Sequence, residues 1–392
     1  MFLFNPDNDL ALANFNSNYT PPASALKIAG DLAALPLWFA PNHSKVVAEG
    51  LDNEHFLSFI QKSFPIQSSL ISFSDISRFP EEEIIPWGWN PALRKRLLDT
   101  GVSEEKLPSM NELKQLRDYS GRQHAVKMLR ELKMQRSDFC GESYFFDNVD
   151  DTQRFLSSRS GNKVLKMPNS GSGKGLIWIL GDITDKQTDW CRRVIREQGG
   201  VIAEPVLEKV QDFALEFFAE NGNVRFSGYS LFQSAASGAY LGNLLLSDTD
   251  IEKTLSKYVS IETLHWLKAF YPQKLAEYFP QYNGFIGVDM MVCGTKNNYR
   301  VQPCVEMNLR MNMGMVARIF HDKFVHLHSS GKFVVDFFKK RGEALDFQQK
   351  MQKKFPLSVE NGRIKSGYLN LTPISGETNY VAWMIVERNV SE

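Results

Sequence analysis

Residues 164–180 read VLKMPNSGSGKGLIWIL, a loop of glycine, serine and asparagine between two apolar runs. The β-branched and aromatic residues on both sides predict two strands joined by residues 169–175. A glycine- and serine-rich loop between antiparallel strands can fold over phosphates and offer them backbone N–H groups and hydroxyls. Lys166, on the first strand, would add a positive charge beside a phosphate chain. The stretch therefore indicates phosphate binding, and its alternative is an ordinary hairpin turn with a solvated lysine.

A P-loop is the obvious competing interpretation of this stretch, and the residues exclude it. The Walker pattern needs a glycine five residues before its Gly-Lys pair, a Ser or Thr after the lysine, and then a helix. Here Pro168 lies five residues before Gly173, Gly175 follows Lys174, and a strand comes next.

A second feature follows in VIAEPVLEKVQDF, residues 201–213. Glu204 to Leu207 leave a predicted strand and enter a linker, and Asp212 lies at the start of the next strand. Exposed backbone in such a linker could read the edge of an adenine, and a carboxylate could bind a pair of ribose hydroxyls. An ordinary strand connection is the alternative, because this feature alone is weak.

Two carboxylates, Asp289 in GVDMMV and Glu306 in RVQPCVEMNLRMNMG, each lie within an apolar strand. A buried carboxylate needs a partner, since burial of a lone charge costs several kcal/mol. The i, i+2 spacing places Asn308, and then Arg310, on the same strand face as Glu306. Oxygen ligands alone suit Mg²⁺ rather than zinc. A structural ion-pair network of Asp289, Glu306 and Arg310 is the alternative.

These features, taken in order, resemble those of the ATP-grasp family, which includes biotin carboxylase, D-alanine–D-alanine ligase and glutathione synthetase. The resemblance rests on the loop KMPNSGSGKG, residues 166–175, and on the strand EMNLR, residues 306–310, which is nearly the form seen in biotin carboxylase. It covers residues 119–330. It implies an α+β ATP-grasp fold, in which two α+β subdomains grip ATP, preceded by an N-terminal α/β domain.

The domain organisation is expected to have three parts. A change of composition near Pro108 and a charged helical stretch after it place the first boundary at residue 118. Residues 1–118 would form the N-terminal α/β domain and residues 119–330 the ATP-grasp domain. Residues 331–392 would complete that domain with a basic helix at about 331–354 and a final strand pair at about 366–386.

The resemblance also implies a role for each candidate residue. Asp289, Glu306 and Asn308 would hold two Mg²⁺ ions, for which Mn²⁺ is a possible substitute. Arg310 and Lys166 would be catalytic, with Arg310 stabilising charge on an acyl-phosphate or on the carboxylate substrate. The residues expected to bind ATP are Lys127, Lys166, Ser170, Gly171, Ser172, Gly173, Lys174, Glu204, Val206, Leu207 and Asp212. Two alternatives stay open, Arg122 in place of Lys127 on the α-phosphate and Glu208 in place of Asp212 on the ribose.

The activity expected from this resemblance is ATP- and Mg²⁺-dependent ligation. A small-molecule or peptide carboxylate would be activated as an acyl-phosphate and joined to an amine nucleophile, with release of ADP. Two alternatives keep the fold: a nucleotide-binding scaffold without catalysis, and a kinase that phosphorylates a small-molecule hydroxyl.

Composition bounds the class of protein. The 392 residues carry 45 basic and 45 acidic side chains, so no general positive charge indicates a nucleic-acid partner. No run approaches the roughly 18 apolar residues of a membrane span. Four cysteines without a CxxC pair and a start without signal-peptide features favour a cytoplasmic protein with reduced thiols. A homodimer is the default expectation for its assembly.

Overall fold

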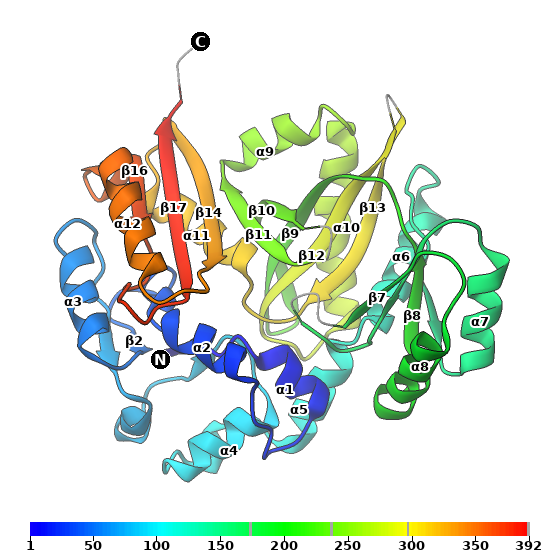
Figure 1. Ribbon diagram of the computed structural model, residues 1–392, viewed down its shortest axis with the longest axis horizontal. Coiled ribbons are helices and arrows are strands. Elements are labelled where there is room, and N and C mark those ends of the chain that lie inside the picture. The colour runs from blue at the N-terminus through cyan, green and yellow to red at the C-terminus, as the bar shows by residue number, and fades with distance from the viewer. Residues whose placement is uncertain (172–174, 236–237, 296–297, 390–392) are drawn as a thin grey trace. The chain divides into compact units, whose positions relative to one another are not determined.

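The computed structural model describes residues 1–171, 175–235, 238–295 and 298–389. The predicted loop residues Ser172, Gly173 and Lys174 lie outside the described residues. The chain divides into two compact units, coloured along the sequence in Figure 1. The first unit contains residues 1–113, 241–247 and 311–392, and the second contains residues 114–240 and 248–310. The predicted domain boundaries at residues 118 and 330 stay a prediction.

The first unit begins with a parallel four-stranded sheet in the order β3-β2-β1-β4. Its elements are β1 (Phe2–Leu3), α1 (Asn8–Asn14), α2 (Ala23–Asp31), a 3₁₀ helix (Leu35–Trp38), β2 (Lys45–Val47), α3 (Leu51–Ile60), β3 (Ser69–Ile71), β4 (Ile85–Pro86) and α4 (Pro91–Asp99). Helix α5 (Met110–Tyr119) runs into the second unit. The parallel sheet confirms the predicted N-terminal α/β domain.

The last part of the chain returns to this unit and shares its core. Trp38 is fully buried, packs edge-on against Phe320 and Phe324, and donates from Nε1 to the carbonyl of Leu371 at 2.6 Å. The C-terminal strands pair in the order β11-β14-β17-β16-β15. These elements are β11 (Tyr240–Leu245), α11 (Met313–Phe324), β14 (Ser329–Phe337), α12 (Glu343–Lys354), β15 (Ser358–Glu360), β16 (Arg363–Asn370) and β17 (Tyr380–Arg388).

The basic helix predicted at 331–354 is wrong over its first half, residues 331–342. Residues 329–337 form β14, which pairs along its whole length with β17, and only α12 is helical. Phe333 and the β-branched Val334 and Val335 favour a strand, and Phe333 is fully buried in it. Gly342, at positive φ, begins the helix. The predicted final strand pair is confirmed as β16 and β17.

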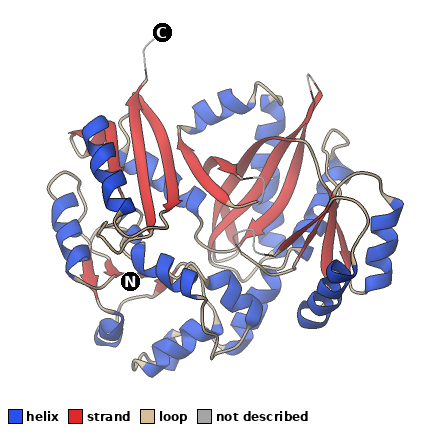
Figure 2. Ribbon diagram, viewed as in Figure 1, coloured by secondary structure: helices blue, strands red, loops and turns tan. Residues whose placement is uncertain are grey.

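The second unit contains two α+β halves, as expected, and the first is built on a small antiparallel sheet in the order β5-β8-β6-β7. Helices cover one face of this sheet, where Phe155 and Cys191 pack against Leu165 and Ala203 (Figure 2). Because side chains alternate along a strand, Lys166 and Glu204 point to the other face. Its elements are β5 (Tyr144–Phe146), α7 (Val149–Ser158), β6 (Lys163–Lys166), β7 (Leu176–Ile179), α8 (Asp185–Gln198) and β8 (Val201–Pro205).

The second half is built on long antiparallel strands in the order β13-β12-β9-β10. The hairpin predicted at Asn221-Gly222 is confirmed, and both residues have the positive φ that such a turn needs. Helix α10 packs on one face, where the Tyr271 hydroxyl donates to the Pro303 carbonyl at 2.6 Å. Its elements are α6 (Gln123–Gln135), β9 (Lys209–Glu220), β10 (Asn223–Ser234), α9 (Asp248–Leu255), α10 (Ile261–Tyr278), β12 (Gly284–Thr295) and β13 (Asn298–Asn308).

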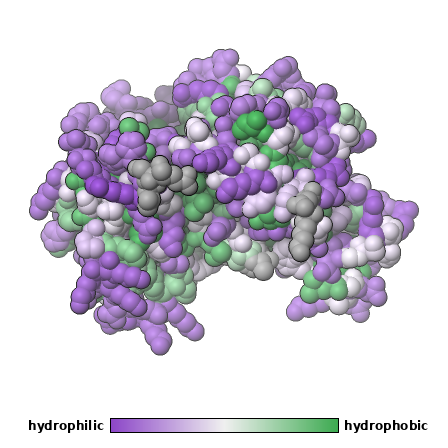
Figure 3. Space-filling view, turned by 90° about the horizontal axis from the view of Figure 1, so that it is seen from above, coloured by the Kyte–Doolittle hydropathy of each residue, from purple (hydrophilic) through white to green (hydrophobic). Residues whose placement is uncertain are grey.

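Among the described residues, no helix is both long and apolar enough to cross a membrane. The face of the molecule in Figure 3 is largely hydrophilic and shows only small, separate hydrophobic patches.

Candidate functional site

The glycine-rich loop joins β6 to β7, so a strand lies on each side of it, as predicted. The Met167 N–H donates to the Gly175 carbonyl at 2.9 Å and closes the base of the loop. A side chain at residue 175 would not fit, because its Cβ would lie 2.2 Å from Ser170 Oγ. Ser170 is buried beneath the loop, and Gly171 follows it. The tip, residues 172–174, is not among the described residues.

Arg122 lies at the base of this loop, at the N-cap position of α6. Its Nη1 donates to the Met167 carbonyl at 2.8 Å and to Ser170 Oγ at 2.6 Å. Its Nη2 forms an ion pair with Glu306 Oε1 at 2.7 Å, and the side chain is only 6% exposed. The guanidinium therefore connects the loop of the small sheet to the acidic strand of the large sheet.

Lys127 occupies a different place from Arg122. Five residues further along α6, it projects from another side of the helix, and its ammonium lies 5.0 Å from the centre of the Tyr278 ring. Of the two alternatives for an α-phosphate contact, Arg122 contacts the described part of the loop, whereas Lys127 lies over the Tyr278 ring. Any role of either residue toward a nucleotide stays a prediction.

Lys166 and Glu204 form a buried ion pair on neighbouring strands. Lys166 Nζ lies 2.7 Å from Glu204 Oε2, and the two side chains are 9% and 10% exposed. The second oxygen of Glu204 accepts a hydrogen bond from Ser143 Oγ at 2.8 Å. A buried charge without a partner is strongly destabilising. Removal of either Lys166 or Glu204 would therefore leave the other charge uncompensated and lower the stability of the fold.

The linker after Glu204 begins where β8 ends, at Pro205. The Val206 N–H donates to the Asn162 carbonyl at 2.9 Å, while the Val206 side chain is 38% exposed. Leu207 is partly buried. The predicted linker, residues 204–207, is therefore hydrogen-bonded to the chain just before β6 at Val206, and the apolar Val206 side chain is exposed.

Asp212 lies in β9, opposite Met291 of β12. Its Oδ2 accepts hydrogen bonds from Ser234 Oγ at 2.5 Å and from Lys209 Nζ at 2.7 Å. The other ribose alternative, Glu208, is exposed and uses its carbonyl to accept the Gly294 N–H. Asp212 is the better placed of the two alternatives, since it shares a sheet face with Asp289.

The predicted metal-binding residues come together on the large sheet. Asp289 and Glu306 are directly opposite each other on β12 and β13. Asn308 Nδ2 donates to Asp289 Oδ2 at 3.1 Å, and Arg310 Nη2 donates to Asn308 Oδ1 at 3.2 Å. The spacing argument thus correctly placed Glu306 and Asn308 on one face of β13, whereas Arg310 lies two residues beyond the end of this strand and reaches back to Asn308.

The electrostatics of this cluster favour a cation. Burial, and secondly the charge of Glu306, raise the pKa of Asp289 to about 7, against the lowering effect of Asn308 and Arg310. Two facing carboxylates with an amide oxygen form an oxygen donor set with excess negative charge, which fits Mg²⁺. Among the described residues, no three His, Cys, Asp or Glu side chains form a metal-binding group by themselves, so a metal here would also need Asn308 or other ligands.

Cys304, in β13, is a buried thiol near the proposed site. Burial raises the pKa of Cys304, and the charges of Asp289, Glu204 and Lys166 also act on it. A thiol with a raised pKa stays protonated and is therefore a poor nucleophile.

The sequence analysis missed Glu216, a fourth carboxylate on the face of the large sheet that carries Asp212, Asp289 and Glu306. Glu216 is 2% exposed and lies opposite Gly287, which in turn lies opposite Asn308. The sequence held a signal for this residue, because Glu216 is the one charged residue in the apolar stretch FALEFF, residues 213–218. It lies four residues after Asp212, and residues an even number apart on a strand share a face.

No protein-family model matches the sequence, and no curated protein does either. Among solved structures, the complex of biotin carboxylase with βγ-ATP from Campylobacter jejuni aligns with 99% of this chain and 87% of its own, at a TM-score of 0.51 and 10% identity. The ADP complex of an N5-carboxyaminoimidazole ribonucleotide synthetase aligns with 99% of this chain and 91% of its own, at a TM-score of 0.51 and 9% identity. Biotin carboxylase belongs to the family named on the motifs above. The chain therefore has the ATP-grasp fold.

Proposed function

We propose that the protein is an ATP- and Mg²⁺-dependent ligase that joins a carboxylate to an amine through an acyl-phosphate. One observation carries the proposal: Arg122 connects the glycine-rich loop, through Ser170, to Glu306 of the acidic cluster. The proposed phosphate-binding loop and the proposed Mg²⁺ ligands therefore contact the same buried side chain. Phosphoryl transfer from ATP needs a metal ion beside the phosphates, and this arrangement would supply it.

The nucleotide would lie between the two sheets of the second unit. Arg122 and Lys166 supply positive charge beside the loop, and both are buried. Their fixed positions would orient the phosphates without a large entropic cost at the moment of reaction. The other proposed contacts are the loop Ser170 to Lys174 with the phosphates, the hinge Glu204 to Leu207 with adenine, and Asp212 with the ribose.

The metal would be held by Asp289, Glu306 and Asn308, and two ions are expected by resemblance. Bound Mg²⁺ supplies neutralisation of the charge that develops on the β- and γ-phosphates. Arg310 donates to Asn308 and so lies at the edge of this cluster, where its guanidinium can bind a substrate carboxylate.

The proposed reaction has two steps and forms no covalent bond to the protein. A carboxylate oxygen of the substrate attacks the γ-phosphorus of ATP, and the bond to ADP breaks. The amine then attacks the acyl carbon, phosphate leaves, and the amine loses a proton. In both steps the guanidinium of Arg310 would stabilise negative charge on the oxygens of the carboxylate or acyl-phosphate.

The cell compartment belongs to the same proposal. All four cysteines are free thiols, which fits a reducing compartment such as the cytoplasm. The expected homodimer stays a prediction.

ADP release tests the function directly. The purified protein is incubated with ATP, Mg²⁺ and a mixed pool of amino acids and small acids, and products are identified by mass spectrometry. We expect ADP together with an amide, and complete loss of both in Glu306→Gln. Glu220→Gln, at the exposed end of β9, is the matched control and should keep full activity.

The alternatives give different results in the same assay. A phosphorylated hydroxyl product without amide would identify a kinase, and nucleotide binding without ADP would identify a scaffold. Undiminished turnover in Glu306→Gln would show that the acidic cluster is not the metal site.

A further inference from the structure

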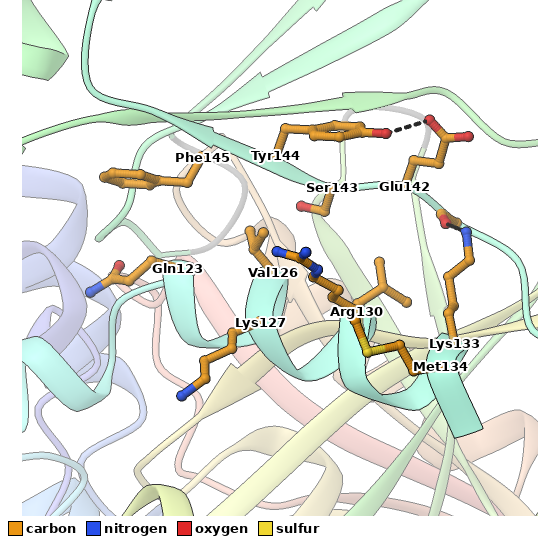
Figure 4. Close-up of a pocket in the computed structure, with 12 residues that line it drawn as sticks. Gln123, Val126, Lys127, Arg130, Lys133, Met134, Glu142, Ser143, Tyr144 and Phe145 are labelled. Carbon is orange, nitrogen blue, oxygen red and sulfur yellow. Dashed lines mark hydrogen bonds between the residues drawn. The ribbon is translucent and has the colours of Figure 1, made fainter. Parts of the chain in front are cut away.

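A cavity of about 770 Å³ lies between helix α6 and strand β5 in the second unit (Figure 4). Ligand-binding cavities usually span about 300 to 1,000 Å³, so this one has the size to hold a small organic molecule. Its walls include Val126, Arg130, Lys133 and Met134 from α6, and Ser143 and Phe145 from the β5 side.

The guanidinium of Arg130 is the unexplained charge in this cavity. Figure 4 shows the side chain extending from α6 toward the β5 side of the cavity. Within the described part of the chain, no ion pair or hydrogen bond compensates Arg130. Lys133, on the same side of α6, donates to the Gly141 carbonyl at 2.6 Å and brings a second positive charge to the wall. The local field therefore favours an anion.

The only acidic side chain that lines the cavity in the described structure is already neutralised. Glu142 Oε2 pairs with Arg159 Nη2 at 3.0 Å and accepts the Tyr144 hydroxyl at 3.0 Å. Glu142 therefore leaves the charge of Arg130 without compensation.

Part of the wall is apolar and open to solvent. Met134 is 70% exposed and Phe145 is 40% exposed, and Val126 lies between α6 and β5 in Figure 4. Exposed apolar side chains of this size gain free energy when a ligand covers them, at roughly 25 cal/mol per Å². The wall thus suits a molecule with an apolar part as well as an acid group.

The cavity does not include Arg122, Lys166 or Ser170, which are proposed to bind the phosphates of ATP, although Lys127, the alternative to Arg122, lines it. Arg122 points to Ser170 and Glu306, whereas the cavity begins one residue later on α6, at Gln123. The two places share a wall, because Ser143 lines the cavity and also donates to Glu204.

We propose that this cavity is a second binding site, specific for a small organic anion with an apolar or aromatic part, whose acid group pairs with Arg130. The site is distinct from the proposed nucleotide site and does not depend on the ligase activity for its existence.

Anilinonaphthalene sulfonate has both properties and its fluorescence reports binding. The dye is titrated into wild type, Arg130→Gln, Arg130→Glu and Arg192→Glu. Arg192, exposed on α8 and paired with Asp189, is the charge-matched control. Because Arg130 is exposed and makes no contact that folding needs, circular dichroism and the thermal midpoint should be the same in all four proteins.

We expect saturable binding of one dye, a Kd raised at least about tenfold in Arg130→Gln and further in Arg130→Glu, and an unchanged Kd in Arg192→Glu. An excess of ATP with Mg²⁺ should leave the dye bound. No binding, or an equal Kd in all four proteins, would overturn the proposal. Competitive displacement by ATP would also overturn it, because the cavity would then be part of the nucleotide site.

Discussion

Asp289→Asn should remove a large pH-dependent term from the stability of the metal-free protein. The pKa of Asp289 is raised from 3.8 to about 7 by burial and by the charge of Glu306. Between these two values the unfolded chain has released the proton and the folded chain still holds it. Because the unfolded state then binds fewer protons, the free energy of unfolding falls as the pH rises from about 4 to about 7.

The magnitude follows from the difference between the two pKa values. One unit corresponds to about 1.4 kcal/mol, so a rise of about three units amounts to about 4 kcal/mol at pH values above 7. An asparagine keeps the size of the side chain and carries no charge, so the variant does not lose this energy. Titrating groups far from Asp289 are common to both proteins and cancel when the two are compared, whereas Glu306 interacts with Asp289, so the expected difference is given as a range.

Urea unfolding in the presence of a chelator measures this effect, at about pH 4.5 and about pH 8. The loss of stability between the two pH values should be larger in wild type than in Asp289→Asn by roughly 2 to 4 kcal/mol. Asp182→Asn, at an exposed position before α8, should behave like wild type. Saturating Mg²⁺ at the higher pH should raise the free energy of unfolding of wild type and leave that of Asp289→Asn unchanged.

Two results would refute the reasoning. Equal pH dependence in wild type and Asp289→Asn would show that this carboxyl titrates normally and is not held in a buried, acidic cluster. Equal stabilisation of both proteins by Mg²⁺ would show that the ion binds elsewhere.

Three other substitutions test separate contacts. Lys166→Met should lower the free energy of unfolding in urea by about 3 to 5 kcal/mol, because it leaves Glu204 buried without its cation. The double variant Lys166→Met with Glu204→Gln should regain part of this free energy. A further loss in the double variant would contradict the pairing. Arg122→Gln should raise the KM for ATP at least about tenfold in the ADP assay, and an unchanged KM would place the phosphates away from the base of the loop. Trp38→Ala should cost about 3 to 5 kcal/mol in urea unfolding, since Trp38 is fully buried; a loss below about 1 kcal/mol would contradict its central place in the core.

Local patterns predicted the parts of the site that lie on single strands. The even spacing of Glu306 and Asn308 places them on one face of a strand, because side chains alternate with a period of two, whereas Arg310 lies beyond the end of β13. The glycines and serines of residues 169–175 likewise predicted a loop between strands, which the structure has. These predictions needed only the geometry of one stretch of backbone.

The sequence left the positions of Arg122 and Lys127 on the helix open, and the structure places them on different sides of α6. The structure begins α6 at Gln123, so Arg122 lies at the N-cap and its side chain reaches Met167 and Ser170. Helix ends depend on capping and on the chain that packs against them, and residue composition places them only within a few residues.

The lysine-rich C-terminal stretch shows the opposite failure. Residues 331–337 were predicted as helix together with the basic segment that follows, yet they form β14 through pairing with β17, about 50 residues later in the chain. A strand is stabilised by hydrogen bonds to a partner strand, and that partner can lie anywhere in the sequence. A short stretch of sequence therefore does not contain the interaction that makes it a strand.

The sequence by itself determined the order and residue types of the motifs: a loop of glycine and serine between strands, carboxylates and an amide at strand spacing, and a composition without a general charge for a polyanion. Only the tertiary structure decided that Asp289 faces Glu306, that Arg122 joins this cluster to the loop, and that Glu216 lies on the same sheet face. The reason is physical. Chemistry belongs to side chains and can be read along the chain, whereas distances between strands are set by packing and pairing among residues far apart in sequence.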